Sequence, residues 1–166
     1  MIHLNSVATL WQDRYQVLVL PVPTSGILRQ RALLKSQALY PSHASAYRTA
    51  CQRSELPLGG VLVHDVERDL AGMGVDPALS KPKFIVDLAV TEFAEHAPHL
   101  SAIEQTLAAF APTLYDWARY DGIRRVALLA SDEVMLPTAT TFEDAVLPLL
   151  KKYLQPTRAL NLWVYR

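Results

Sequence analysis

One continuous stretch decides the fold: residues Gly26–Leu56, which read GILRQRALLKSQALYPSHASAYRTACQRSEL. On both sides of Pro41 the apolar residues recur with helical spacing, so we predict one helix over 27–39 and a second over 42–53. Ser42 directly follows the proline and is expected to be the N-cap of the second helix. The run before this stretch, at 16–22, is almost continuously apolar, which is typical of a strand covered on both faces.

Further strands and helices are predicted on either side of that stretch. Ser101 and Glu104 form a capping-box pattern, which starts a third helix that runs to about Tyr120 and ends at Asp121-Gly122. Pro112 lies inside this helix and is expected to kink it or to break off its first half. The strand-like runs are 2–7, 16–22, 60–66, 84–90, 125–130 and 159–165.

A fourth helix is predicted from a second capping-box pattern at Thr141–Asp144, and it continues to Leu154. Residues 70–82 are predicted to form one long loop. Strands that alternate with helices indicate an α/β protein with three layers, α/β/α, around a central mixed, mostly parallel sheet. The length of 166 residues suits a single domain over residues 1–166.

The composition excludes several classes of function. The 16 basic and 16 acidic residues give a formal net charge of zero, so we expect neither a nucleic-acid partner nor an anionic membrane surface. We expect no signal peptide, because residues 1–6 lack a basic region and a long apolar core, and no membrane helix, because no apolar run approaches about 20 residues. The one cysteine, Cys51, cannot form an internal disulfide and fits a reducing compartment. We therefore expect a cytoplasmic protein.

Several short motifs resemble those of macrodomains, the modules that bind ADP-ribose and in some families remove it. They are Ala46-Tyr47, Ala50-Cys51, Ser54-Glu55-Leu56 and the strand Phe84-Ile-Val-Asp-Leu88. The resemblance covers essentially the whole chain and is strongest to the branch of the DNA ADP-ribosyl-glycohydrolase antitoxins and terminal ADP-ribose hydrolases. It implies the macrodomain fold, an ADP-ribose-type ligand and, by analogy alone, a place in a toxin–antitoxin or defence system.

The positions that contact ligand in that family depart from its pattern together. Thr9 stands where the resemblance implies an aspartate for the adenine amine, and Leu20 and Pro23 replace the asparagines that hold the distal ribose. Thr91 replaces the lysine implied in hydrolysis. The second phosphate loop, glycine-rich in the family, reads Ser131-Asp-Glu-Val-Met-Leu-Pro137, and its two carboxylates are expected to repel a pyrophosphate.

Eight residues are nevertheless the candidates for ligand contact. Arg29, Arg31 and Lys35 are expected to compensate for lost glycines by binding phosphate directly, or else to form a solvated helix face. Asp132 is either a relocated acid or an ordinary loop residue. We assign no catalytic residue, no metal ligand and no cofactor. The candidates are Thr9, Thr24, Ser25, Gly26, Arg29, Arg31, Ser131 and Asp132.

Three functions remain open from the sequence. The first is a degenerate macrodomain that hydrolyses nothing and works as a binding or interaction module for a protein partner of unknown identity. The second is a remodelled binder of ADP-ribose or a related nucleotide. The third is an ADP-ribosyl hydrolase with a relocated acid, Asp132 or Glu133. The joint loss of the polar ligand positions favours the first, since unmet hydrogen bonds cost about 1–3 kcal/mol each.

Overall fold

The structure is a computed structural model that describes residues 1–66 and 82–166. The predicted loop at 70–82 therefore lies, apart from its last residue, outside the described residues. The strands are β1 (Ile2–Asn5), β2 (Val17–Pro23), β3 (Val61–Asp65), β4 (Phe84–Thr91), β5 (Arg125–Leu129) and β6 (Asn161–Tyr165). The helices are η1 (Val7–Thr9), α1 (Arg31–Leu39), α2 (Pro41–Gln52), α4 (Leu100–Tyr120), α5 (Asp132–Met135), η2 (Phe142–Val146) and α6 (Leu147–Tyr153).

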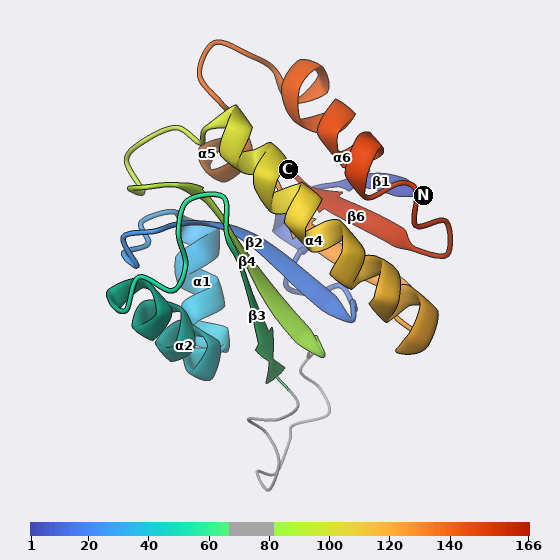
Figure 1. Cartoon of the computed structure of the whole chain (residues 1–166), viewed down its shortest axis with the longest axis horizontal. Helices are drawn as coiled ribbons and strands as arrows, with labels where there is room; N and C mark the ends of the chain where they lie inside the picture. Colours follow the sequence, from blue (N-terminus) through green and yellow to red (C-terminus); the bar gives the residue numbers. More distant parts are fainter. Residues whose placement is uncertain (67–81) are drawn as a thin grey trace, which may run out of the picture.

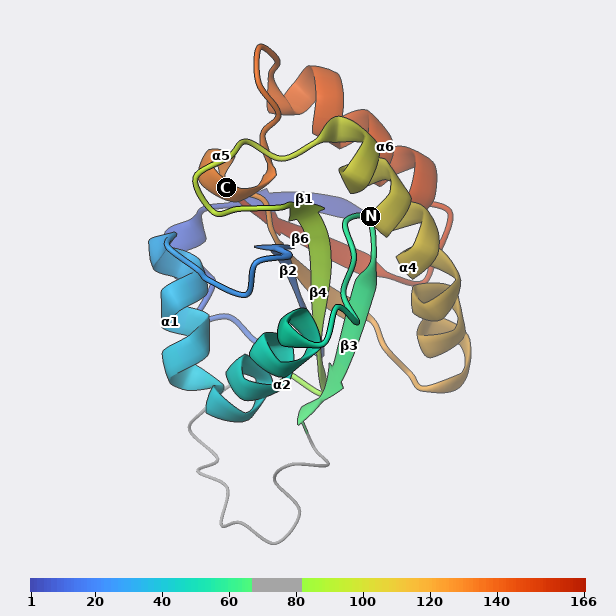
Figure 2. The ribbon, with the colours of Figure 1, turned by 60° about the vertical axis from the view of Figure 1, so that its left-hand side comes forward.

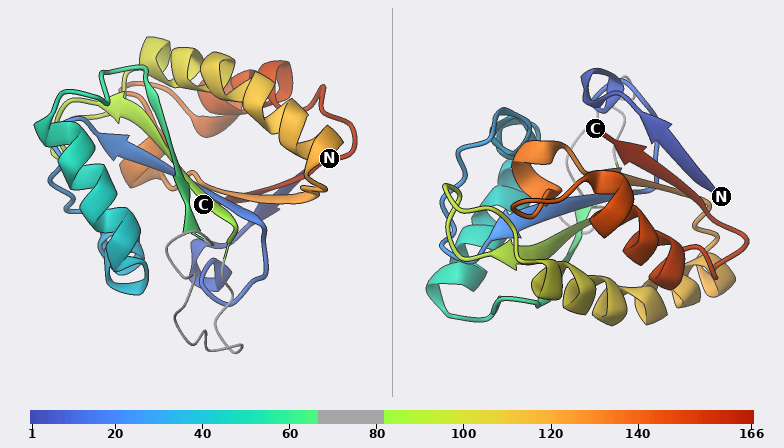
Figure 3. Two further views of the ribbon diagram at one scale, coloured as in Figure 1. Left: turned by 60° about the horizontal axis from the view of Figure 1, so that its bottom comes forward. Right: turned by 90° about the horizontal axis from the view of Figure 1, so that it is seen from above.

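The six strands form one sheet in the order β1-β6-β5-β2-β4-β3. All neighbouring pairs are parallel except β3 with β4, which confirms the predicted mixed, mostly parallel sheet. Helices α4 and α6 cover one face of this sheet, and α1 and α2 lie on the other (Figures 1 and 3). The three-layer α/β/α architecture is therefore confirmed.

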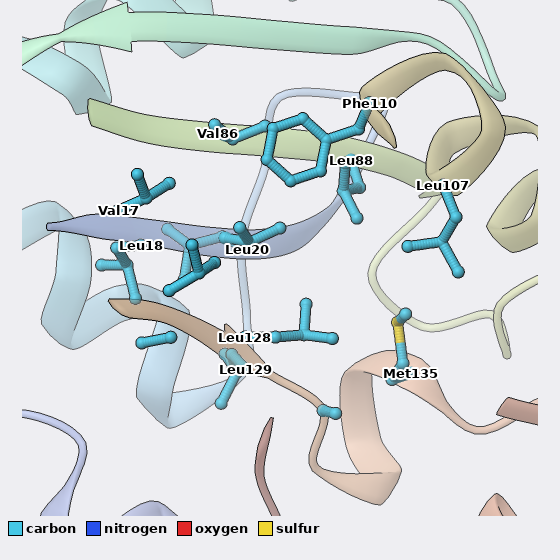
Figure 4. Packing of buried hydrophobic residues seen from close by; sticks show 14 of the residues in the cluster. Val17, Leu18, Leu20, Val86, Leu88, Leu107, Phe110, Leu128, Leu129 and Met135 are labelled. Atoms are coloured by element: carbon cyan, nitrogen blue, oxygen red, sulfur yellow. The ribbon is translucent and has the colours of Figure 1, made fainter. Parts of the chain in front are cut away.

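The core lies around the central strands, as their continuous apolar runs predict. Every residue of β2 is buried, and so is every residue of β4 after Phe84. Figure 4 shows side chains of β2, β4 and β5 packed with Leu107 and Phe110 of α4 and with Met135 of α5. Because helices cover both faces of these strands, side chains on both faces are apolar, and apolar and polar residues do not alternate along the strand.

The first two helices start differently from the prediction. Helix α1 begins at Arg31 rather than at residue 27, so residues 27–30 extend the loop after β2. Helix α2 begins at Pro41, and its N-cap is Tyr40 instead of Ser42. Proline at the first helical position lacks only an N–H that would have no partner there, and its fixed φ suits the helix. Pro41, which was predicted to precede the helix, is thus its first residue.

Helix α4 is one continuous helix through Pro112. Its N-cap is His99, so the predicted capping box at Ser101 is wrong, and the predicted break at Pro112 does not occur. Pro112 is exposed, while Leu107, Phe110 and Leu114 on the opposite face are buried. Burial of that apolar face on the sheet outweighs the one backbone hydrogen bond that proline removes. No helix among the described residues is long and apolar enough to cross a bilayer.

Two predicted helix ends are confirmed. The Thr141 side chain accepts a hydrogen bond from the Asp144 amide at 3.2 Å, as an N-cap does, although the first turn, η2, is a π-helix. Gly122 follows the last turn of α4 with φ +68°, the left-handed conformation that a helix C-terminus favours. The sequence did not predict the two shortest helices, η1 and α5, which both follow carboxyl ends of strands.

Candidate ligand-binding site

The candidate residues gather at one edge of the sheet. In a parallel sheet the carboxyl ends of the strands meet at the same edge, where ligands of α/β proteins commonly bind. The loops that follow β2 and β4 lie there together with α1, α5 and the carboxyl end of β6 (Figure 2). Three of the cavities that residues 1–66 and 82–166 form lie at this edge, and their volumes differ by almost two orders of magnitude.

The largest cavity, here called the open hollow, has a volume of about 850 Å³. It brings together three of the predicted residues, Arg31, Ser131 and Asp132. It also contains Trp11 and Arg166, which sequence reasoning did not select. The residues around it are Val7, Ala8, Trp11, Arg31, Ala32, Lys35, Ser131, Asp132, Glu133 and Arg166.

Two cations of the open hollow carry no ion pair within the described part of the chain. Arg31 and Lys35 are exposed and lie one turn apart on α1, so their side chains project from the same face of the helix. The Lys35 ammonium lies 6.0 Å from the centre of the Trp11 ring. An aromatic ring beside two free cations can contact a flat base and a phosphate at once.

The acidic side of the hollow is partly neutralised. One Arg166 amino group lies 3.3 Å from Asp132 Oδ1, and the other lies 2.9 Å from Glu143 Oε1. The guanidinium also covers the Phe142 ring, with 4.1 Å to its centroid. Asp132 therefore repels an anion less than the sequence suggests, whereas Glu133 has no ion pair among the described residues.

The second cavity, here called the narrow pocket, lies at the carboxyl ends of β2 and β4 and has a volume of about 10 Å³, roughly the size of one water molecule. Pro23, Gln30 and Thr91 line it. The Gln30 side-chain amide donates to the Ala94 carbonyl oxygen at 2.8 Å, and the Thr91 hydroxyl donates to the Phe93 carbonyl oxygen at 3.2 Å. Both polar side chains are thus bonded to the loop after β4.

The loop after β2 is also bonded to the loop after β4. The Thr24 amide donates to the Thr91 carbonyl oxygen at 2.9 Å, and the Ser25 amide donates to the Glu92 carbonyl oxygen at 3.0 Å. The Ile27 amide donates to the Ser25 hydroxyl at 3.3 Å. These three amides are therefore used within the protein and are not free to bind a phosphate.

Gly26 is held in place by packing. Its φ of +79° favours glycine, and a Cβ added there would lie 3.1 Å from the Cys51 Cβ. The hydroxyl of Tyr47 donates to the Pro23 carbonyl oxygen below the same loop. Burial raises the pKa of the Cys51 thiol, which keeps it protonated at neutral pH and disfavours a nucleophilic role.

Besides Gly26, four predicted residues lie outside the open hollow. Thr24 and Ser25 line a third cavity of about 430 Å³, between the loop after β2 and the end of α2. Thr9 is exposed in η1 and donates to the Ser6 carbonyl oxygen at 3.1 Å, while its neighbour Ala8 faces the hollow. Arg29 forms an exposed ion pair with Glu95. The described residues contain no group of three or more His, Cys, Asp or Glu side chains that could hold a metal ion.

Comparison with known proteins identifies the fold. No family model matches the chain, and no curated protein matches it by sequence. The macrodomain of Thermus aquaticus DarG aligns over 100% of this chain and 98% of its own, with a TM-score of 0.77 and 17% identity. The macrodomain of Mycobacterium tuberculosis DarG aligns over 99% and 97%, with a TM-score of 0.77 and 22% identity.

A third solved structure carries a ligand. Thermosipho africanus DarTG, solved in complex with ADP-ribose, matches with a TM-score of 0.70 and 17% identity, over 92% of this chain but 38% of its own. At these identities the likeness shows the fold alone. The chain has the macrodomain fold, as the motifs from Ala46 to Leu56 and at Phe84–Leu88 predicted.

We predict that Gly26 is more sensitive to alanine than Gly122. Both have positive φ, which costs a side chain about 1–2 kcal/mol. Only Gly26→Ala also brings a Cβ against Cys51, because nothing lies within 4 Å of a Cβ at Gly122. Urea unfolding should show a loss of about 1 kcal/mol for Gly122→Ala and about 2–3 kcal/mol for Gly26→Ala. Equal losses would mean that the contact with Cys51 does not constrain the loop.

Proposed function

We propose that this chain is a non-catalytic binding module built on the macrodomain fold. The observation that carries the proposal is the narrow pocket, whose volume of about 10 Å³ leaves no room for a sugar at the carboxyl ends of β2 and β4. This is the place where the resemblance implies the distal ribose and the hydrolytic residues. A macrodomain closed at that place retains only its other surfaces for binding.

The residues around the closed place support the same proposal. Thr91 stands at the position of the implied lysine, and its hydroxyl is already bonded to the Phe93 carbonyl oxygen. Leu20 is buried in the core, and Pro23 has no N–H and accepts from the Tyr47 hydroxyl through its carbonyl oxygen. None of these three side chains can activate a water molecule or orient a sugar.

The hydrolase alternative has one remaining candidate. Glu133 borders both the open hollow and the narrow pocket, whereas Asp132 is held by Arg166. Hydrolysis of a glycosidic bond ordinarily uses two catalytic groups, one as general acid and one as base or nucleophile. Without the implied lysine, Glu133 has no second catalytic group beside it. The small volume of the narrow pocket therefore supports a binding module more strongly than Glu133 supports an enzyme.

The absence of hydrolysis is directly testable. ADP-ribosylated DNA and ADP-ribosylated protein should remain intact when incubated with a large molar excess of the chain, because the sugar cannot reach a catalytic group. Release of ADP-ribose, measured by chromatography, would contradict the proposal. If release occurs and Glu133→Gln abolishes it while Asp144→Asn, an exposed control on η2, does not, the relocated-acid hydrolase is correct.

The open hollow supports a second candidate, a nucleotide as the bound ligand. Its volume of about 850 Å³ lies within the range of small-molecule sites. Trp11 offers a ring face for a base, and Arg31 and Lys35 offer unpaired positive charge for a phosphate. Thermosipho africanus DarTG was solved with ADP-ribose, which makes a nucleotide of this kind the first ligand to try.

Millimolar AMP should then raise the melting temperature. Ligand at ten times its Kd stabilises by about 1.4 kcal/mol, or roughly 3–6 °C for a chain of this length. The double variant Arg31→Gln/Lys35→Gln should lose the shift, while Arg48→Gln/Arg53→Gln, two changes on or beside α2, should retain it. An unchanged melting temperature would exclude the nucleotide and leave a protein partner as the ligand of the module.

A further inference from the structure

The third cavity, here called the side cavity, lies beside the joined loops and has a volume of about 430 Å³. It shares no lining residue with the open hollow or the narrow pocket. Its walls are the loop after β2, the end of α2 with the segment 54–58, and the loop after β4, which lie side by side (Figures 1 and 3). Each wall contributes side chains: Ser25 from the first, Ser54 and Leu58 from the second, and Glu92 and Phe93 from the third.

Hydrogen bonds hold the walls of the side cavity together. Two amides of the loop after β2 donate to carbonyl oxygens of the loop after β4. The Gly59 amide donates to the Ala89 carbonyl oxygen of β4 at 2.8 Å, which ties the segment after α2 to the sheet. The cavity is therefore formed before a ligand arrives, and filling it requires little ordering of the chain.

The side cavity is bordered by exposed apolar side chains. Phe93 is 48% exposed and Leu58 is 37% exposed, although both are large apolar residues. The Phe93 ring packs edge to face against the His96 ring, with 5.4 Å between the centroids, so its position is supported from one side. Accessible apolar side chains around a concave site are typical of a surface that binds another molecule.

The charge of the side cavity is negative. Of the described residues that line it, Glu92 alone is charged, and it forms no ion pair within residues 1–66 and 82–166. Arg53 and Glu55 are exposed and opposite in charge, Glu95 is paired with Arg29, and none of the four lines the cavity. A free carboxylate beside an accessible ring attracts a cation and repels a phosphate.

Ser54 adds a hydroxyl to the side cavity from a strained backbone position. Its φ is +55°, the left-handed conformation that glycine ordinarily supplies after the last turn of a helix. The Glu55 amide donates to the Ala50 carbonyl oxygen at 2.9 Å, which closes that turn around Ser54. Glycine would relieve the strain but would remove the hydroxyl, so a ligand contact through this hydroxyl accounts for the serine.

We propose that the side cavity binds an arginine side chain of a partner protein, with the guanidinium over the Phe93 ring, paired with Glu92 and donating to the Ser54 hydroxyl. A guanidinium is flat and has five N–H donors, so it stacks on a ring while it bonds a carboxylate and a hydroxyl, whereas an ammonium is a point charge. Arginines that fill a pocket are common anchors of protein interfaces. The inference rests on the proposed function, since it names the chemistry of the partner that the binding module takes.

The test is an NMR titration of the isotope-labelled chain with the capped peptide acetyl-Gly-Arg-Gly-amide. The amide resonances of Ser25, Ser54 and Leu58 should shift and saturate at millimolar peptide, because these residues line the side cavity. The same peptide with citrulline in place of arginine has the same shape without the charge. It should bind at least about threefold more weakly, because it forms neither the ion pair nor the cation–π contact.

Variants separate the charge from the hydroxyl. Glu92→Gln should bring the Kd values of the arginine and citrulline peptides to within about twofold. Asp116→Asn removes an exposed carboxylate from α4, away from the side cavity, and should preserve their difference. Ser54→Gly should weaken binding of the arginine peptide, yet its melting temperature should be unchanged or higher, because glycine adopts this φ without strain.

Three results would overturn the proposal: no saturable shift at these amides, equal affinity for the arginine and citrulline peptides, or the same loss in Asp116→Asn as in Glu92→Gln. Equal affinity would identify a purely apolar contact. None of these results bears on hydrolysis, because the titration contains no ADP-ribosylated substrate, and the proposed function fails instead by release of ADP-ribose. Circular dichroism melting of each variant verifies that it is folded.

Discussion

The pairing of β2 with β4 continues beyond the ends of both strands, and the rest of the site depends on it. The amides of Thr24 and Ser25 donate to the carbonyl oxygens of Thr91 and Glu92, so the two loops are joined where a ligand would otherwise enter between them. The Gln30 side-chain amide also donates a hydrogen bond to the Ala94 carbonyl oxygen in the loop after β4. Buried backbone groups must be paired, and here they are paired with each other rather than with a phosphate. The loops after β2 and β4 are thus bonded to each other at the carboxyl ends of their strands.

The larger cavity lies beside these joined loops. Beside the narrow pocket, the segments after β1 and β5 border an open hollow of about 850 Å³, which Trp11 lines together with Arg31 and Lys35 of α1. Arg166 neutralises Asp132 within it, so its balance of charge suits an anion better than the acidic loop alone suggests.

The fold was largely predictable, because it depends on patterns local in the sequence. Apolar runs located all six strands, and Thr141 and Gly122 marked real helix ends. The failures have local causes as well: Pro41 is the first residue of α2, and Pro112 is tolerated because burial of the opposite helix face holds α4 together.

The site was only partly predictable, because it depends on residues distant in sequence. The structure places three of the predicted residues, Arg31, Ser131 and Asp132, around one cavity, and their role in ligand contact stays a prediction. Trp11 and Arg166 were missed, although Arg166 directly follows the last strand, and the rule for carboxyl ends of parallel strands could have found it.

We propose that no sugar enters between the loops after β2 and β4. Isothermal titration calorimetry with ADP and with ADP-ribose tests this proposal, since the two ligands differ by the distal ribose. The distal ribose should add nothing to the affinity: the two Kd values should agree within about threefold, or neither ligand should bind. ADP-ribose that binds tenfold or more tightly than ADP, a difference of about 1.4 kcal/mol, would show that the loops separate to receive the sugar and would contradict the proposal.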